Sequence, residues 1–150
     1  MQTVTHLTPD FAVAGELSDA DFEEAAASGF KAIINNRPDG EAPGQPTAAS
    51  QKAIAEKHGL QYVHIPVNQA NIFSDSVVGA MADTLAKLDG PILAHCKSGM
   101  RSAIVWAAAS ARTRPVAEVE KILSQGPFDL SFLHDELEQQ AAHAAGTETA

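Results

Sequence analysis

Residues 91–102 read PILAHCKSGMRS, and the predicted architecture rests on this segment. Pro91–His95 is a short apolar run that favours a buried strand, and Ser102–Ser110 is an alanine-rich run that favours a buried helix. Six residues, including Gly99, separate the two runs. A buried strand that passes through a tight turn into a helix is the repeating unit of a parallel sheet covered by helices. We therefore predict an α/β fold around this segment.

The rest of the chain alternates in the same way. Apolar spacing and capping residues such as Ser18 and Thr47 define the other elements. In this fold, binding sites form at the carboxyl ends of the strands, which here means the loops after Asn35, Val67 and His95. We assign residues 1–145 to one domain and 146–150 to a flexible tail. Strands are expected at residues 4–7, 11–13, 31–35 and 62–67, and helices at 18–29, 47–59, 77–88, 115–126 and 131–143.

Composition excludes several classes of protein. The chain has 150 residues, 45% of them hydrophobic, which fits one globular domain and excludes general disorder. Its formal charge of −9 makes it a poor binder of nucleic acid or of an anionic membrane. A single cysteine allows no internal disulfide and fits a reducing compartment. Since neither a basic leader nor a membrane-spanning run is seen, we expect a cytoplasmic location.

The segment after His95 has the composition of an anion-binding site. Backbone N–H groups of a tight turn converge on one point, and the start of a helix adds positive potential there. Arg101 adds a fork of donors, and Gly99 lets the backbone bend. Cys96 lies at the base of this field, where its thiol should lose its proton readily and act as a nucleophile. The competing interpretation is a small buried apolar cysteine.

The segment 95–102 resembles the signature loop of the cysteine-dependent phosphatases, which also runs His-Cys, then glycine, then Arg-Ser or Arg-Thr at a helix start. Together with IINNRPD (residues 33–39) and YVHIPV (residues 62–67), it makes the chain from 4 to 145 similar to a bacterial family, the beta-lactamase-hydrolase-like phosphatase-like domain. Its members occur alone or fused to persulfide dioxygenases. The resemblance implies a tyrosine- or dual-specificity-phosphatase-like fold, with a parallel sheet flanked by helices.

Two departures from the phosphatase pattern concern the chemistry. Four residues separate Cys96 from Arg101, where phosphatases have five, and four is the spacing of many rhodanese sulfurtransferases. A shorter ring of amides suits the single terminal sulfur of a persulfide. Asn68 stands where dual-specificity phosphatases usually place an acidic residue, and an amide does not protonate a leaving group. Asp75 is a possible general acid, or else a first-turn acid of the third helix that favours the helix dipole.

The remaining site residues have two interpretations each. The resemblance implies that His95 orients the loop through hydrogen bonds, and the alternative is a core histidine. We expect Ser102 both to donate to the thiolate and to cap the helix. Arg37 either binds an anionic group or pairs with Asp39. Lys97 either attracts an anionic substrate or is simply solvated. We expect no metal and no cofactor, because the histidines lack ligand spacing. The predicted anion-binding loop comprises Lys97, Ser98, Gly99, Met100 and Arg101.

The leading hypothesis from the sequence is a sulfurtransferase. The Cys96 thiolate takes the outer sulfur of thiosulfate or of a persulfide, the loop and Arg101 hold the resulting Cys96 persulfide, and an external thiol accepts the sulfur. A persulfide dioxygenase is a candidate partner. The alternative is a hydrolase, a phosphomonoesterase that forms a phosphocysteine on Cys96, with Arg101 holding the phosphoryl oxygens. A third hypothesis, a non-catalytic anion-binding module, is disfavoured by the intact Cys96, Arg101 and Ser102.

Overall fold

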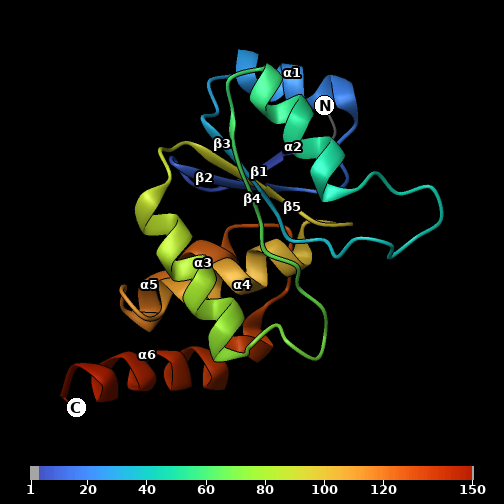
Figure 1. Cartoon of the computed structure of the whole chain (residues 1–150). Coiled ribbons are helices and arrows are strands. Elements are labelled where there is room, and N and C mark those ends of the chain that lie inside the picture. Colours follow the sequence, from blue (N-terminus) through green and yellow to red (C-terminus); the bar gives the residue numbers. More distant parts are fainter. Residues whose placement is uncertain (1–3, 150) are drawn as a thin grey trace.

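The computed structural model describes residues 4–149, with side chains through residue 143. A five-stranded sheet forms its centre, with strand order β1-β2-β5-β3-β4 (Figure 1). Strands β2, β5, β3 and β4 are parallel, as predicted, whereas β1 pairs antiparallel with β2. Only a two-residue turn separates β1 from β2, which is too short for a parallel crossover. The strands are β1 (Val4–Thr8), β2 (Phe11–Ala14), β3 (Ala32–Asn35), β4 (Gln61–His64) and β5 (Ile92–His95).

Helices cover both faces of the sheet, so the molecule has three layers (Figure 1). Side chains of successive strand residues point to opposite faces, and Ile33 and Ile34 accordingly join different cores. The smaller core lies under α1 and α2, and the larger one lies under the other helices. One face carries α1 (Asp19–Ala27) and α2 (Ala48–Lys57); the other carries α3 (Asp75–Lys87), α4 (Met100–Ser110), α5 (Val116–Ser124), the 3₁₀ turn η1 (Ser131–Leu133) and α6 (His134–Thr149).

The predicted helix starts at Ser18 and Thr47 are confirmed, because both side chains accept a backbone N–H of the first turn. Other boundaries differ. Strand β4 ends at His64 rather than at Val67, since Pro66 has no N–H to donate to a ladder. The sequence predicts that the last helix ends at about His143, but α6 continues to Thr149. Ala150 lies outside the described residues.

The carboxyl ends of β3, β4 and β5 meet at one edge of the sheet, because these strands are parallel neighbours. The backbone beyond them stays paired: the N–H of Val67 donates to the carbonyl of Asn36, and the N–H of Asn36 donates to the carbonyl of His95. The three predicted loops therefore start from a common, fixed edge. Among the described helices, none is both long enough and apolar enough to cross a bilayer.

Candidate active site

Cys96 follows β5 directly and is fully buried. Its Sγ accepts a hydrogen bond from the backbone N–H of Gly99 at 3.1 Å, so the turn curls around the sulfur. Gly99 has a φ of +93° and occupies the N-cap position of α4, which begins at Met100, two residues before the predicted start. The thiol thus lies beside the amino-terminal end of an 11-residue helix, where the helix dipole favours negative charge.

Arg101, in the first turn of α4, connects the three loops. Its Nη1 donates to the carbonyl of Val67 at 2.9 Å and to Oε2 of Glu41 at 2.7 Å. Its Nη2 donates to Oε1 of Glu41 at 2.8 Å, which completes a bidentate ion pair. The hydrogen bond with Glu41 is the main cause of a raised pKa of Arg101, and interaction with the Cys96 side chain adds to the effect. The guanidinium and the sulfur are therefore neighbours.

Glu41 is a site residue that the sequence analysis missed. It lies in the loop between β3 and α2 and also accepts a hydrogen bond from Nε of Arg37 at 3.0 Å. The hydrogen bonds and positive charges of Arg101 and Arg37 lower the pKa of its carboxyl to about 2, so Glu41 is ionised at neutral pH. Its position shortly after a strand end was the one available signal, because an isolated glutamate in a polar loop is usually solvated.

Arg37 is buried and lies between two carboxylates. Besides donating to Glu41, it forms an ion pair with Glu16, where Nη1 and Oε1 are 2.9 Å apart. The alternative pairing with Asp39 is absent from the described contacts, because Asp39 instead accepts the backbone N–H of Ala48 at the start of α2. Arg37 thus supports the site through Glu41 rather than by lying in the cradle itself.

Ser102 makes neither of the predicted contacts. Gly99 holds the N-cap position of α4, and the Ser102 hydroxyl donates to Oδ1 of Asn36 at 2.8 Å. Nδ2 of Asn36 donates in turn to the carbonyl of Ile65 at 3.0 Å. Both side chains are buried, so these bonds satisfy groups that are out of reach of water. Asn36 is a second residue that the sequence analysis missed as a site component, and it ties α4 to the ends of β3 and β4.

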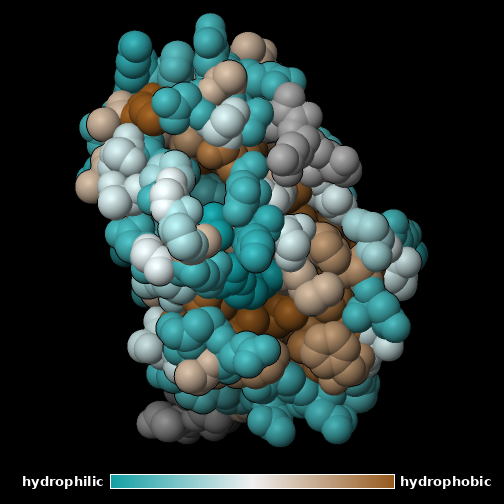
Figure 2. Space-filling view, turned by 90° about the vertical axis from the view of Figure 1, so that its right-hand side faces the viewer, coloured by the Kyte–Doolittle hydropathy of each residue, from teal (hydrophilic) through white to brown (hydrophobic). Residues whose placement is uncertain are grey.

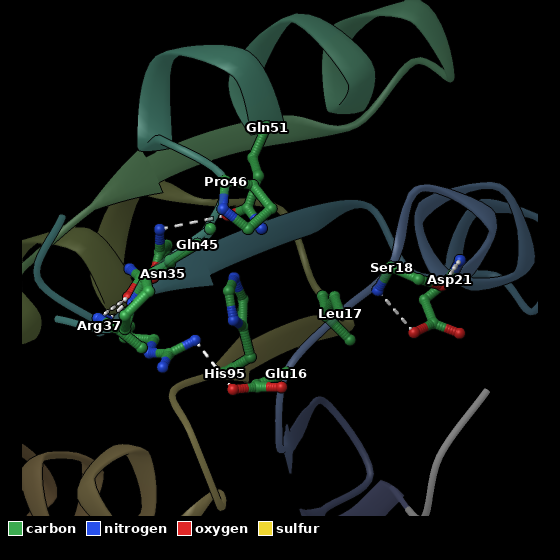
Figure 3. Close-up of a pocket in the computed structure, with 13 residues that line it drawn as sticks. Glu16, Leu17, Ser18, Asp21, Asn35, Arg37, Gln45, Pro46, Gln51 and His95 are labelled. Carbon is green, nitrogen blue, oxygen red and sulfur yellow. Dashed lines mark hydrogen bonds and ion pairs between the residues drawn. The ribbon is translucent and has the colours of Figure 1, made fainter. Parts of the chain in front are cut away.

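His95 lines a different pocket, on the α1 and α2 face of the sheet. Figure 3 shows its ring pointing into this cavity of about 660 Å³, between Leu17 and Arg37. Neither ring nitrogen has a hydrogen-bond partner among the described residues, which contradicts the expected orienting hydrogen bonds. Burial, reinforced by the electrostatic effect of Arg37 and His64, lowers the pKa of His95 to about 4. The ring is therefore neutral at pH 7.

Asp75 and Asn68 occupy positions that bear on proton transfer. Asp75 is exposed, accepts a hydrogen bond from Nη2 of Arg112 at 2.8 Å, and is not among the groove-lining residues described below. The hydrogen bond from Arg112 lowers its pKa. Asn68 lines the groove, but its Oδ1 accepts the backbone N–H groups of Ala70 and Asn71. In the described part of the groove, Glu41 is thus the carboxyl group present, and it is ionised.

A groove of about 790 Å³ opens beside Arg101 and Glu41. Its opposite side is apolar, and two of its side chains are unusually exposed for their type: Phe132 at 68% and Met100 at 42%. Figure 2 shows hydrophobic surface gathered in a hollow on this face of the molecule. Lys97 and Ser98 are exposed, and Ser98 also lines the groove. The larger apolar residues of the groove are Ile72, Phe73, Met100, Ile104 and Phe132.

The described residues contain no group of three or more histidine, cysteine, aspartate or glutamate side chains placed to hold a metal ion. The chemistry that the described geometry offers is that of a thiol whose sulfur accepts one backbone N–H at the start of a helix, with one guanidinium beside it. Such an arrangement can bind an anion and attack it.

Comparison with known sequences gives one family. The model of the phosphatase-like domain of beta-lactamase hydrolase-like protein matches residues 3–113. The beta-lactamase hydrolase-like protein of Agrobacterium fabrum (strain C58) is 36% identical over 132 residues, covering 87% of this chain and 30% of that protein. The protein of the same name from Xylella fastidiosa (strain 9a5c) is 32% identical over 140 residues, covering 92% and 32%. The chain thus spans about a third of the length of these curated relatives.

Solved structures confirm the predicted fold. A candidate phosphatase of Neisseria meningitidis Z2491 superposes with a TM-score of 0.76 at 28% identity, covering 91% of this chain and 96% of that one. Tk-PTP in its active form gives a TM-score of 0.64 at 16% identity, covering 93% and 96%. The catalytic core of the PP-IP phosphatase SIW14 of S. cerevisiae gives a TM-score of 0.62 at 12% identity, covering 97% of this chain and 92% of that one. The architecture is that of the cysteine-dependent phosphatases.

Proposed function

The chain belongs to the family of phosphatase-like domains found in beta-lactamase hydrolase-like proteins, and from this premise we propose that it hydrolyses phosphate monoesters through a phosphocysteine on Cys96. This places the alternative from the sequence ahead of sulfur transfer. The observation that carries it is the enclosure of the Cys96 sulfur by the Gly99 turn, next to the start of α4 and the Arg101 guanidinium. The solved phosphatases of the same fold support ranking phosphate ester hydrolysis ahead of sulfur transfer.

The reaction has two steps. The Cys96 thiolate attacks phosphorus, the S–P bond forms, and the bond from phosphorus to the leaving oxygen breaks. Water then attacks the phosphocysteine, releasing inorganic phosphate and the thiolate, while the proton from water passes to solvent. Loop amides and Arg101 stabilise the charge on the phosphoryl oxygens in both transition states. Preorganised donors aimed at developing charge provide the largest share of catalysis in sites of this kind.

The groove indicates which phosphate esters are accepted. Asn68 is occupied in a turn, Asp75 is paired with Arg112, and Glu41 is ionised, so none of the three is in place to protonate a leaving oxygen. Esters whose leaving group departs as a stable anion need no such acid. The apolar side of the groove fits an aromatic leaving group. We therefore assign aryl phosphates, rather than alkyl phosphates, to this site.

The test compares p-nitrophenyl phosphate with glycerol phosphate. Wild-type protein is expected to release phosphate from the aryl ester alone, and Cys96→Ser is expected to have no activity. Arg101→Ala should lower kcat by about 10²–10³-fold, the usual loss when one charge-stabilising donor is removed. Rapid quenching and mass spectrometry should detect a phosphate adduct on Cys96. Turnover that survives Cys96→Ser, or equal rates on both esters, would contradict the proposal.

Sulfur transfer remains a second candidate because of the four-residue spacing between Cys96 and Arg101 and because of the missing acid. Transfer of sulfur to a thiol requires no protonation of a leaving alkoxide. Incubation with thiosulfate or glutathione persulfide, followed by mass spectrometry of the intact chain, separates the two functions. A gain of one sulfur atom on Cys96, with no phosphate release from the aryl ester, would reverse their order.

A further inference from the structure

The donors of Arg101 divide into two groups. A guanidinium has five N–H groups. Two from Nη1 and one from Nη2 are donated to Glu41 and to the carbonyl of Val67. The Nε–H and the second N–H of Nη2 remain, and these two point the same way along one edge of the guanidinium plane. The oxygen acceptors seen in the structure therefore occupy one side of the group and leave the opposite edge free of protein oxygens.

The geometry points to Glu41 as a positioning residue that holds Arg101 so that its Nε–Nη2 edge is presented to the anion bound over Cys96. This inference rests on the proposed function, since it concerns the same site. It adds a role for a residue that does not touch the reacting atoms. The carbonyl of Val67, in the segment after β4, binds the same guanidinium and restricts its rotation.

Glu41 is itself held in place. Nε of Arg37 donates to the same Oε1 that accepts from Arg101, so one carboxylate bridges two guanidinium groups. The loop that carries Glu41 is fastened at two points. Nε2 of Gln45 donates to the carbonyl of Pro38 at 2.7 Å, and Asp39 accepts the N–H of Ala48 at 2.8 Å. The backbone that carries Glu41 is thus held in place, so its carboxylate can orient the longer and more mobile side chain of Arg101.

The open edge has a consequence for the substrate. Two parallel N–H groups match two oxygens of one phosphoryl group, as in other bidentate arginine contacts. The single terminal sulfur of a persulfide engages only one of them. Fixing this edge therefore favours a phosphoryl group over a persulfide, and loss of Glu41 should affect phosphate chemistry more than sulfur chemistry.

A double-mutant cycle tests the inference in the 150-residue chain. The variants are Glu41→Ala, Arg101→Ala and the double variant, with Glu41→Gln as a conservative change that keeps one acceptor oxygen. Glu118→Gln is the matched control, because Glu118 of α5 likewise pairs with an arginine, Arg114, outside the site. Two quantities are measured: kcat and KM for p-nitrophenyl phosphate, and the Kd of inorganic phosphate by calorimetry, which does not depend on turnover.

Glu41→Ala is expected to lower kcat by about 10–100-fold in the wild-type background, as misplacement of a catalytic donor does. In the Arg101→Ala background, Glu41→Ala should change kcat by no more than about twofold, because the side chain that Glu41 positions is absent. Glu41→Gln should retain part of the activity, and Glu118→Gln should match the wild type. Equal losses in both backgrounds would assign Glu41 a merely structural role and overturn the inference.

The phosphate titration separates this result from the fate of the proposed function. If the protein binds inorganic phosphate but does not hydrolyse the ester, the proposed function fails, while the same cycle in Kd still decides the role of Glu41. Coupling between Glu41 and Arg101 in Kd would then support the inference. Unchanged phosphate affinity in Glu41→Ala would overturn it.

Discussion

At the scale of single residues, the backbone at Gly99 shapes the site. Its φ of +93° lies in the region that residues with a side chain rarely adopt. A Cβ placed there would lie 3.4 Å from Cζ of Phe128 and 3.5 Å from the backbone of Ala14. The N–H of Gly99 is also the one that reaches Cys96 Sγ. The sulfur's hydrogen bond therefore depends on a backbone conformation that only glycine adopts without strain.

Gly99→Ala should lower the free energy of unfolding by about 1–3 kcal/mol, the cost of a strained backbone conformation. It should also lower kcat, because relief of the strain rotates the N–H away from the sulfur. Urea denaturation and the aryl phosphate assay measure the two effects. Gly79→Ala is the control: Gly79 lies within α3, where alanine should stabilise by about 0.5–1 kcal/mol and leave kcat unchanged. A stabilising Gly99→Ala would contradict this account.

At the scale of elements, Asn36 joins structures that are distant in sequence. Its backbone N–H pairs with the end of β5, its Nδ2 with the segment after β4, and its Oδ1 with Ser102 in α4. Each strand end is free to move alone only if one of these buried bonds breaks. A buried donor or acceptor that is left without a partner costs more free energy than a formed hydrogen bond contributes to stability. The loops of the site therefore hold their spacing as a unit.

Ser102→Ala should destabilise the protein by about 1–3 kcal/mol, since it leaves Oδ1 of Asn36 buried without a donor. Asn36→Ala should cost more, because it also removes the donor to the carbonyl of Ile65. The double variant should lose less than the sum of the two, with a coupling of about 0.5–3 kcal/mol by urea denaturation. Strict additivity would show that the two side chains do not act through one another.

At the scale of the whole molecule, stability is tied to pH through His95. Burial lowers its folded-state pKa to about 4 from an ordinary value of 6.5. Above pH 6.5 the ring is neutral in both the folded and the unfolded chain. As the pH falls below 6.5, the unfolded chain takes up a proton first, so the free energy of unfolding decreases until about pH 4. The neutral ring thus makes the fold sensitive to mild acid.

Between pH 7 and pH 5 the wild-type protein should lose roughly 2 kcal/mol of stability from His95. His95→Leu carries no titratable ring and should lose correspondingly less over the same range, measured by urea denaturation at each pH. The carboxyls of Glu41 and Asp75 have lowered pKa values and titrate below this window. His134, whose pKa is raised by Glu120, acts in the opposite direction but is present in both proteins. Identical pH profiles would contradict the assignment.

Much of the fold follows from local signals. Apolar runs and the capping residues Ser18 and Thr47 predict the elements closely, and the Cys96–Arg101 segment predicts the place of the site. Glu41 was missed because its role depends on Arg101, which is 60 residues away in sequence. Ser102 was misplaced because the partner of its hydroxyl, Asn36, lies 66 residues away. Periodicity reports which face of an element is buried, not which polar partner a tertiary contact supplies.

The groove has a floor and a wall of separate origin. The floor is formed by Ser98 and Arg101 at the start of α4, a helix joined to the sheet through Asn36, whereas Ile72, Phe73 and Phe132 of the wall come from a surface loop and a 3₁₀ turn. Selection can therefore exchange wall side chains one at a time while the reactive floor stays intact. Diversification of relatives, or a laboratory library directed at these three positions, should retune which leaving groups are accepted without rebuilding the nucleophile.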